Sequence, residues 1–143
     1  MTRLTKGLLS IFILLTIGVS TALADDTHKV VIQVSSGDPL IQKIAINNAV
    51  NIQKALGAGN VEIEIVAYGP GLSIMTPKSE QATRVKSLAV DDDISFSACN
   101  NTMQKIKKKK GKLPKLVEGV KVVPSGVVRV IELQEKDYAY IRP

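Results

Sequence analysis

The 143-residue sequence has no tryptophan, a single histidine and a single cysteine, Cys99. Aromatic residues make up 3% of the chain, too few for stacking platforms that bind bases or sugars. One cysteine cannot form an intramolecular disulfide, so no disulfide framework holds the fold. The lone histidine, His28, has no histidine or cysteine near it at metal-ligand spacing, which argues against a metal site.

Phosphate-binding motifs are also missing. The sequence contains no GxxxxGKS/T loop, which excludes a P-loop NTPase. The Gly69-Pro70-Gly71 turn lacks the third glycine of the dinucleotide-binding motif and follows the second predicted strand rather than the first. We therefore expect no metal and no organic cofactor.

The chain begins with the features of a secretory signal peptide. Two basic residues precede an apolar stretch from Leu8 to Val19, and Ala22-Leu23-Ala24 supplies a small-x-small cleavage pattern. We expect cleavage after Ala24, so that residues 1–24 are the leader and residues 25–143 form one domain. The apolar stretch is short for a membrane span of about 20 residues, and the cleavage triplet disfavours an uncleaved anchor. The mature protein is then periplasmic or secreted, without a stable membrane span.

The charge of the mature chain is mildly basic. The leader contains two of the 19 basic residues and none of the 13 acidic ones, leaving 17 basic against 13 acidic residues, a net charge of +4. This balance does not by itself indicate nucleic acid, which an exported protein rarely meets, so we expect no nucleic-acid partner.

Strand-like and helix-like segments alternate along the mature chain, which is typical of an α/β domain with a mainly parallel sheet. The predicted strands are His28–Val34, Val61–Tyr68, Ile94–Ala98, Lys121–Val123 and Tyr138–Ile141. The predicted helices are Pro39–Leu56 with Asp38 as its cap, a weaker one over Lys78–Ala89, one from Asn100 or Asn101 to Gly111, and Val127–Lys136.

Two of these segments carry mixed signals. Propensity alone makes Val127–Leu133 a strand, but a cap at Ser125 and the helical spacing of Val127, Val130 and Ile131 favour a helix. In the second strand, Glu62 and Glu64 alternate with apolar residues, which predicts that one face of the strand is partly solvated, as it is near a sheet edge.

Cys99 is predicted at the carboxyl end of the third strand, directly before a helix. Ligands bind outside the carboxyl ends of the strands in an open parallel sheet. Unpaired N–H groups at a helix N-terminus lower a thiol pKa and favour the nucleophilic thiolate. The candidate site therefore comprises Cys99 as nucleophile, Asn100, Asn101 and Thr102 as donors, and the rim residues Ser36, Gly37, Tyr68, Gly69, Gly71, Ser125 and Gly126. Free cysteines are also often buried and inert, so a packing role stays open.

A run of lysines, Lys105, Lys107–Lys110 and Lys112, lies at the end of the helix that follows Cys99. Cations near a helix C-terminus interact favourably with the helix dipole, so a solvated helix end explains the run. The functional alternative is docking to an acidic partner or to anionic lipid headgroups.

Five stretches, taken in order, are similar to a known family. They are Val30–Val34 (VVIQV), Ala67–Leu72 (AYGPGL), Phe96–Met103 (FSACNNTM), Val122–Val127 (VVPSGV) and Glu132–Ile141 (ELQEKDYAYI). Together they span nearly the whole mature chain, which resembles the DsrE/DsrF-like family, specifically an exported branch of small members.

The resemblance implies a three-layer α/β/α sandwich with a five-stranded, mainly parallel sheet, and a helix at Val127. It also implies assembly into trimers or hexamers. In the sulfur-relay members, the cysteine after the third strand carries sulfur as a persulfide, and Cys99 occupies that position. Those members act in the cytoplasm, whereas this chain has an export signal, and Asp137 stands where similar sequences often have glycine.

Two functions follow from these expectations. In the first, Cys99 receives sulfur from a donor, holds it as a persulfide and passes it to an acceptor thiol, either partner being a protein. In the second, the protein is a non-catalytic oligomer that binds a small ligand or a protein, with Cys99 packed and inert. In that case Leu72, Ile74 and Met75 could belong to an interface rather than to the core.

Overall fold

The computed structural model describes residues 27–91 and 94–143, so the predicted leader lies outside the described residues. The strands are β1 (His28–Val34), β2 (Val61–Ala67), β3 (Ser95–Cys99), β4 (Lys121–Val123) and β5 (Ala139–Ile141). The helices are α1 (Pro39–Leu56), α2 (Ala82–Val90), α3 (Asn100–Lys110) and α4 (Gly126–Gln134), with 3-10 helices η1 (Ala58–Asn60) and η2 (Gly69–Met75).

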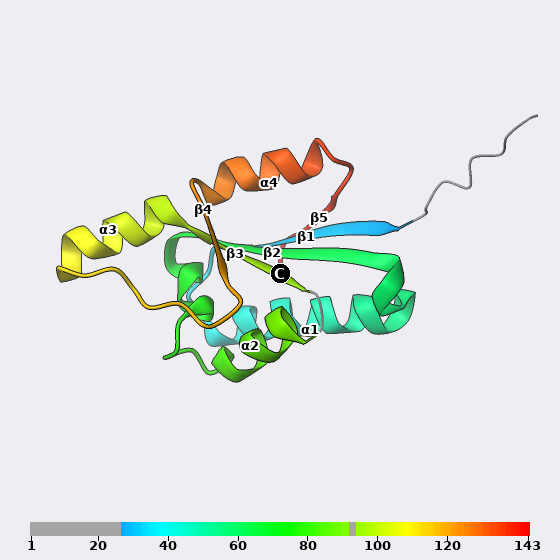
Figure 1. The fold of residues 1–143 in the computed structure, drawn as a ribbon, viewed down its shortest axis with the longest axis horizontal. Coiled ribbons are helices and arrows are strands. Elements are labelled where there is room, and N and C mark those ends of the chain that lie inside the picture. Colours follow the sequence, from blue (N-terminus) through cyan, green and yellow to red (C-terminus); the bar gives the residue numbers. More distant parts are fainter. Residues whose placement is uncertain (1–26, 92–93) are drawn as a thin grey trace, which may run out of the picture.

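The five strands form one sheet in the order β4-β3-β2-β1-β5, and every neighbouring pair is parallel. Helices α1 and α2 cover one face of this sheet and α4 covers the other, while α3 extends from β3 past the end of the sheet (Figure 1). The predicted α/β class and the five-stranded parallel sheet are confirmed. Parallel strands need crossover connections, and the helices supply them.

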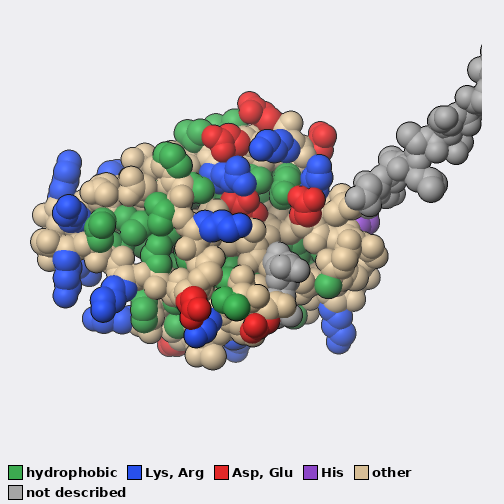
Figure 2. Space-filling model, in the orientation of Figure 1, with side chains coloured by type: hydrophobic (Ala, Val, Ile, Leu, Met, Phe, Trp, Pro, Cys, Tyr) green, Lys and Arg blue, Asp and Glu red, His purple; other side chains and the backbone are tan. Residues whose placement is uncertain are grey.

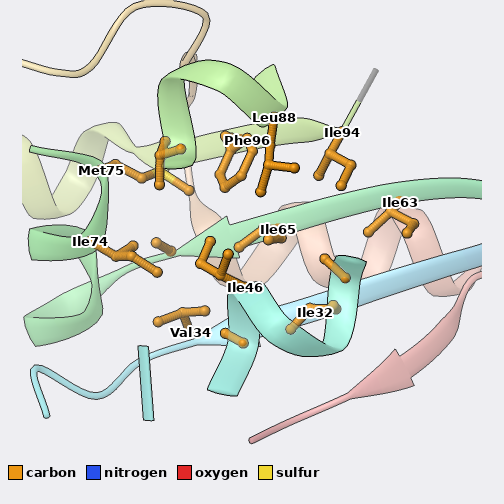
Figure 3. Close-up of a cluster of buried hydrophobic side chains, with 14 of the residues drawn as sticks. Ile32, Val34, Ile46, Ile63, Ile65, Ile74, Met75, Leu88, Ile94 and Phe96 are labelled. Atoms are coloured by element: carbon orange, nitrogen blue, oxygen red, sulfur yellow. The ribbon is translucent and has the colours of Figure 1, made fainter. Parts of the chain in front are cut away.

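The sheet face that packs on α1 and α2 carries the larger of the two apolar clusters. Alternate residues of the strands point into it, among them Ile32, Ile65 and Phe96, all fully buried (Figure 3). Because both faces of a parallel sheet are covered, the strands can be nearly continuous apolar runs. This cluster forms the main core and fixes the positions of the strand ends at which the candidate site lies.

The opposite face, under α4, has a smaller apolar cluster and a buried ion pair. Arg129 of α4 donates to both carboxylate oxygens of Glu64 at 2.8 and 2.7 Å, and Ser97 Oγ donates to Glu64 Oε1 at 2.6 Å. Glu64 is 6% exposed and β2 is the central strand, so the predicted edge position of this strand is wrong. The carboxylate can be buried because the Arg129 guanidinium of α4 neutralises it.

Several local predictions are confirmed. The Asp38 side chain accepts a hydrogen bond from Leu40 N at 2.8 Å, with Pro39 at the first position of α1. The segment at Val127 is helical, as its apolar spacing indicates. Asp137 adopts a left-handed conformation with φ of 66°, which explains why similar sequences can have glycine there.

Two other local predictions are wrong. Helix α2 begins at Ala82 rather than at Lys78, because Ser79 and Ala82 donate backbone hydrogen bonds in successive turns that precede the helix. The side chains of Leu72, Ile74 and Met75, which the binding-protein alternative would place at an interface, lie in the core cluster, because η2 packs against β2, β3, α1 and α2. Among the described residues, no helix combines the length and apolarity that crossing a membrane requires.

Candidate functional site

Cys99 is the last residue of β3 and the N-cap residue of α3, as the sequence predicts. Its side chain lies on the α4 face of the sheet, beside the first residue of α4: a Cβ added to Gly126 would lie 3.2 Å from Cys99 Cβ. The residue is 4% exposed, yet it lines a cleft that opens to solvent. The thiol is therefore at the wall of a cavity and not beneath the core.

Several donors surround the Cys99 sulfur. Burial raises the pKa of the Cys99 thiol, but the Gly126 N–H, the Thr102 hydroxyl and the N–H groups of Thr102 and Asn101 outweigh it. The net effect is a pKa below the ordinary value of a cysteine. These donors favour the thiolate because hydrogen bonds to sulfur stabilise its charged form.

Thr102 links this cysteine to the Gly69-Pro70-Gly71 loop. The backbone N–H of Gly69 donates to Thr102 Oγ1 at 2.9 Å, which leaves the hydroxyl hydrogen free to point at the sulfur. Gly69 has φ of +55°, a conformation that side chains rarely adopt. The predicted role of Thr102 as a donor to the sulfur matches this geometry.

Tyr68 forms the other wall beside the cysteine. Gln33 donates to the Tyr68 hydroxyl, and the Tyr140 hydroxyl donates to Gln33, so that three strand ends are joined at this rim. Burial and the neighbouring Tyr140 raise the pKa of Tyr68, so its hydroxyl stays neutral beside the thiol. A Cβ on Gly126 would lie 2.8 Å from Tyr68 Cδ1, so glycine is needed there for α4 to start this close.

The cleft has a volume of about 1020 Å³ and runs from the rim of the sheet along α3. Its lining includes Cys99, Tyr68, Gly69, Asn101, Thr102 and Ser125 of the predicted site. Much of the remaining lining comes from η2, from the far turns of α3 and from the loop after that helix. The structure thus gathers six of the predicted residues around one cavity.

The other predicted residues support this rim from outside the cleft. Ser36 Oγ accepts from the Asp38 N–H at 3.1 Å, and its carbonyl accepts from Gln42. Gly37 packs on Pro70, since a Cβ there would lie 3.3 Å from the Pro70 Cβ. These contacts hold the turn before α1 in place.

Gly71, Asn100 and Gly126 also lie outside the lining. A Cβ on Gly71 would lie 2.1 Å from the carbonyl oxygen of Val34, so this glycine allows two backbone segments to touch. The Asn100 side chain accepts from Gln104 at 3.1 Å on the solvent side of α3. Gly126 reaches the site through its backbone N–H alone.

Sequence reasoning missed the lysines as part of this site. Six of them line the cleft: Lys78, Lys105, Lys109, Lys110, Lys112 and Lys115. The available signal was helical spacing, because Asn101, Lys105 and Lys109 follow each other at one-turn intervals on the face that carries Asn101 into the site. Figure 2 shows several basic side chains gathered at the end of the molecule occupied by α3.

The part of the chain that the structure describes contains no group of three or more histidine, cysteine or acidic residues able to hold a metal ion. The groups that the structure brings together at the site are the Cys99 thiol, its N–H and hydroxyl donors, and the nearby ammonium groups.

Comparisons with known proteins agree with this architecture. The model of the DsrE/DsrF-like family matches residues 28–143. A solved structure described as a protein of unknown function, MTH1491, from Methanobacterium thermoautotrophicum is 33% identical, with a TM-score of 0.71. The match covers 81% of this chain and 99% of that one. No curated protein matches the sequence significantly.

Proposed function

The chain belongs to the DsrE/DsrF-like family, and on that basis we propose that it carries sulfur as a persulfide on Cys99. The observation that supports this most is the environment of the thiol. Cys99 has a lowered pKa at the start of a helix, and it lines an open cleft. Reactive cysteines occupy such positions, whereas inert ones lie in apolar interiors.

The proposed reaction is an exchange at sulfur. The Cys99 thiolate attacks the terminal sulfur of a donor persulfide, a new S–S bond forms at Cys99, and the donor S–S bond breaks. The donor leaves as a thiolate, so sulfur is transferred without net oxidation or reduction. An acceptor thiolate then attacks the terminal sulfur on Cys99, takes it, and releases the Cys99 thiolate.

The surrounding donors suit both halves of this exchange. The Gly126 N–H and the Thr102 hydroxyl stabilise a negative charge on Cys99 sulfur, both before the attack and when the thiolate leaves. Partners must supply both other thiols, because the chain has only one cysteine.

A direct test exposes the purified mature protein to a low-molecular-weight persulfide and measures the intact mass. The expected result is a gain of one sulfur atom that is removed by a reducing thiol. The Cys99→Ser variant should gain nothing, and iodoacetamide should label wild-type Cys99 in the native state.

The alternative, a non-catalytic binding protein, makes the opposite prediction. If the native protein resists iodoacetamide and gains no sulfur, while the urea-unfolded protein is labelled at Cys99, the carrier proposal is wrong. The unfolded sample controls for a cysteine that was already oxidised.

We also propose that the protein is exported. The support is the leader pattern ending at Ala24, which lies outside the described residues. N-terminal sequencing of the protein from a fractionated host cell tests this: a mature chain starting at Asp25 in the exported fraction is expected. An intact leader on a protein confined to the cytoplasm would contradict it.

A homo-oligomer is proposed as well, with α4 in the interface. Val127, Val128 and Ile131 are each about half exposed on that helix, at 50%, 49% and 50%. Adjacent apolar side chains of this kind often mark protein contacts. Light scattering should give a trimer or hexamer mass for wild type and a smaller one for Val128→Glu. A monomeric wild type would contradict the proposal.

A further inference from the structure

We propose that the lysine-lined cleft binds an extended acidic segment of a partner protein, and that this segment brings the partner's thiol to Cys99. This inference rests on the proposed sulfur exchange and names the chemistry of the partner. It is carried by the charge, the length and the apolar floor of the cleft.

The charge of the cleft has one sign. Six lysines line it and no aspartate or glutamate does. The ion pairs that the described residues form involve Lys86 and Arg129, so no carboxylate neutralises the lysines of the cleft. By contrast, Lys86 lies 2.8 Å from Glu118 elsewhere on the surface. Cations concentrated in a concave surface attract an anionic partner and speed its association.

The lysines form a track that starts at the thiol. Asn101, Lys105 and Lys109 lie one turn apart on the cleft side of α3. At 1.5 Å per residue, the distance from Cys99 to Lys109 along the helix is about 15 Å. An extended chain spans that distance with about five residues. A small inorganic anion would meet only one or two of the six ammonium groups.

The floor of the cleft is apolar. Leu72, Ile106, Leu113, Pro77 and Pro114 contribute to its lining. Leu113 is 42% exposed there, so part of its apolar surface is in contact with solvent. An acidic segment with apolar side chains on its other face would cover these residues, as well as pair with the lysines.

The test uses two synthetic peptides, each with one cysteine next to four other residues, which are glutamates in one and glutamines in the other. Each cysteine is activated as a disulfide with 2-thiopyridine. Attack by the Cys99 thiolate joins Cys99 to the peptide and releases thiopyridone, which is followed by absorbance. At low salt the glutamate peptide should react about tenfold faster. The advantage should vanish at about 1 M salt, where the Debye length is about 3 Å.

Matched variants locate the effect. Lys105→Gln with Lys109→Gln removes two charges inside the cleft, and Lys107→Gln with Lys108→Gln removes two from the same helix outside it. The first pair should abolish most of the preference for the glutamate peptide, and the second pair should retain it. The rate with an uncharged small disulfide is measured for each protein as well, and each peptide rate is divided by it, so that a change in the intrinsic reactivity of Cys99 is not mistaken for a change in peptide preference.

The outcomes separate this inference from the sulfur proposal. Equal rates for the two peptides, with normal reaction of the uncharged disulfide, would overturn the inference and leave Cys99 reactivity intact. An equal loss in both lysine variants would also overturn it. If Cys99 reacts with none of the disulfides, binding is measured instead by the fluorescence anisotropy of a labelled glutamate peptide mixed with the Cys99→Ser variant. Binding of this peptide would support the inference, and absence of binding would overturn it. Retention on phosphatidylglycerol vesicles without peptide binding would assign the lysines to a lipid surface instead.

Discussion

The buried Glu64–Arg129 pair predicts a large effect of a small substitution. The side chains of Glu64 and Arg129 are 8% and 27% exposed, and two hydrogen bonds of 2.7 and 2.8 Å join them. Glu64→Gln keeps the shape but removes the negative charge, so that among the described residues the one carboxylate still paired with the Arg129 guanidinium is that of Glu132, at 3.4 Å on the surface. Breaking a buried pair costs about 3–5 kcal/mol, and partial exposure of the arginine lowers this to about 3 kcal/mol.

Thermal and urea unfolding measure this cost. At about 4 °C per kcal/mol for a domain of this size, Tm should fall by about 12 °C. Lys86→Met, which breaks the exposed pair with Glu118, serves as the control and should leave Tm nearly unchanged. If Glu64→Gln matched that control, the claim that this pair holds α4 on the sheet would be wrong.

The stability that the Glu64–Arg129 pair contributes depends on pH, and the pKa of Glu64 sets the direction. Burial raises the pKa of Glu64, but the hydrogen bonds from Arg129 and Ser97 outweigh it, so the folded-state pKa lies below the ordinary value of 4.5. The stabilisation is therefore fully present above pH 4.5 and is lost as the pH falls through the lowered folded-state pKa. The difference in stability between wild type and Glu64→Gln should shrink in acid, and a constant difference would refute the linkage.

Three further predictions concern the rim and the helix starts. Thr102→Val removes the hydroxyl that donates to the Cys99 sulfur, so the pKa of the thiol should rise. The pH midpoint of the rate of alkylation by iodoacetamide measures this pKa, and an unchanged midpoint would exclude the hydrogen bond. Gly71→Ala forces a Cβ into the backbone of β1 and should cost more than about 3 kcal/mol in urea unfolding, whereas Gly59→Ala, with open space around it, should not. Asp38→Ala removes the cap of α1 and should cost about 1 kcal/mol, measured by the same urea transition.

The order and class of the elements could be predicted because local patterns determine them. The apolar run of β1, the Asp38 cap and the helical spacing after Ser125 each indicate one element, and the structure contains all three. Helix α4 overrides its β-branched propensity because its apolar stripe packs Val130 and Leu133 onto the sheet. The position of Cys99 at the rim followed from the same order of elements.

Longer-range relations could not be predicted. From its place in the sequence, Glu64 looks like a solvated strand residue. It is buried because it pairs with Arg129, which lies 65 residues later in the chain. The lysines of the cleft likewise look like a solvated helix end. They become part of the site because η2 and the loop containing Leu113 line the same cavity, which the sequence does not reveal.

The sheet order has a consequence for synthesis. The outer neighbour of β1 is β5, which pairs Val30 with Ala139 and Ile32 with Ile141. During translation, this edge of β1 therefore stays open until residues 139–141 have been made. An open strand edge is a template for aggregation, so the nascent polypeptide needs shielding over that whole interval. A truncation before Ala139 would leave β1 without this neighbour permanently.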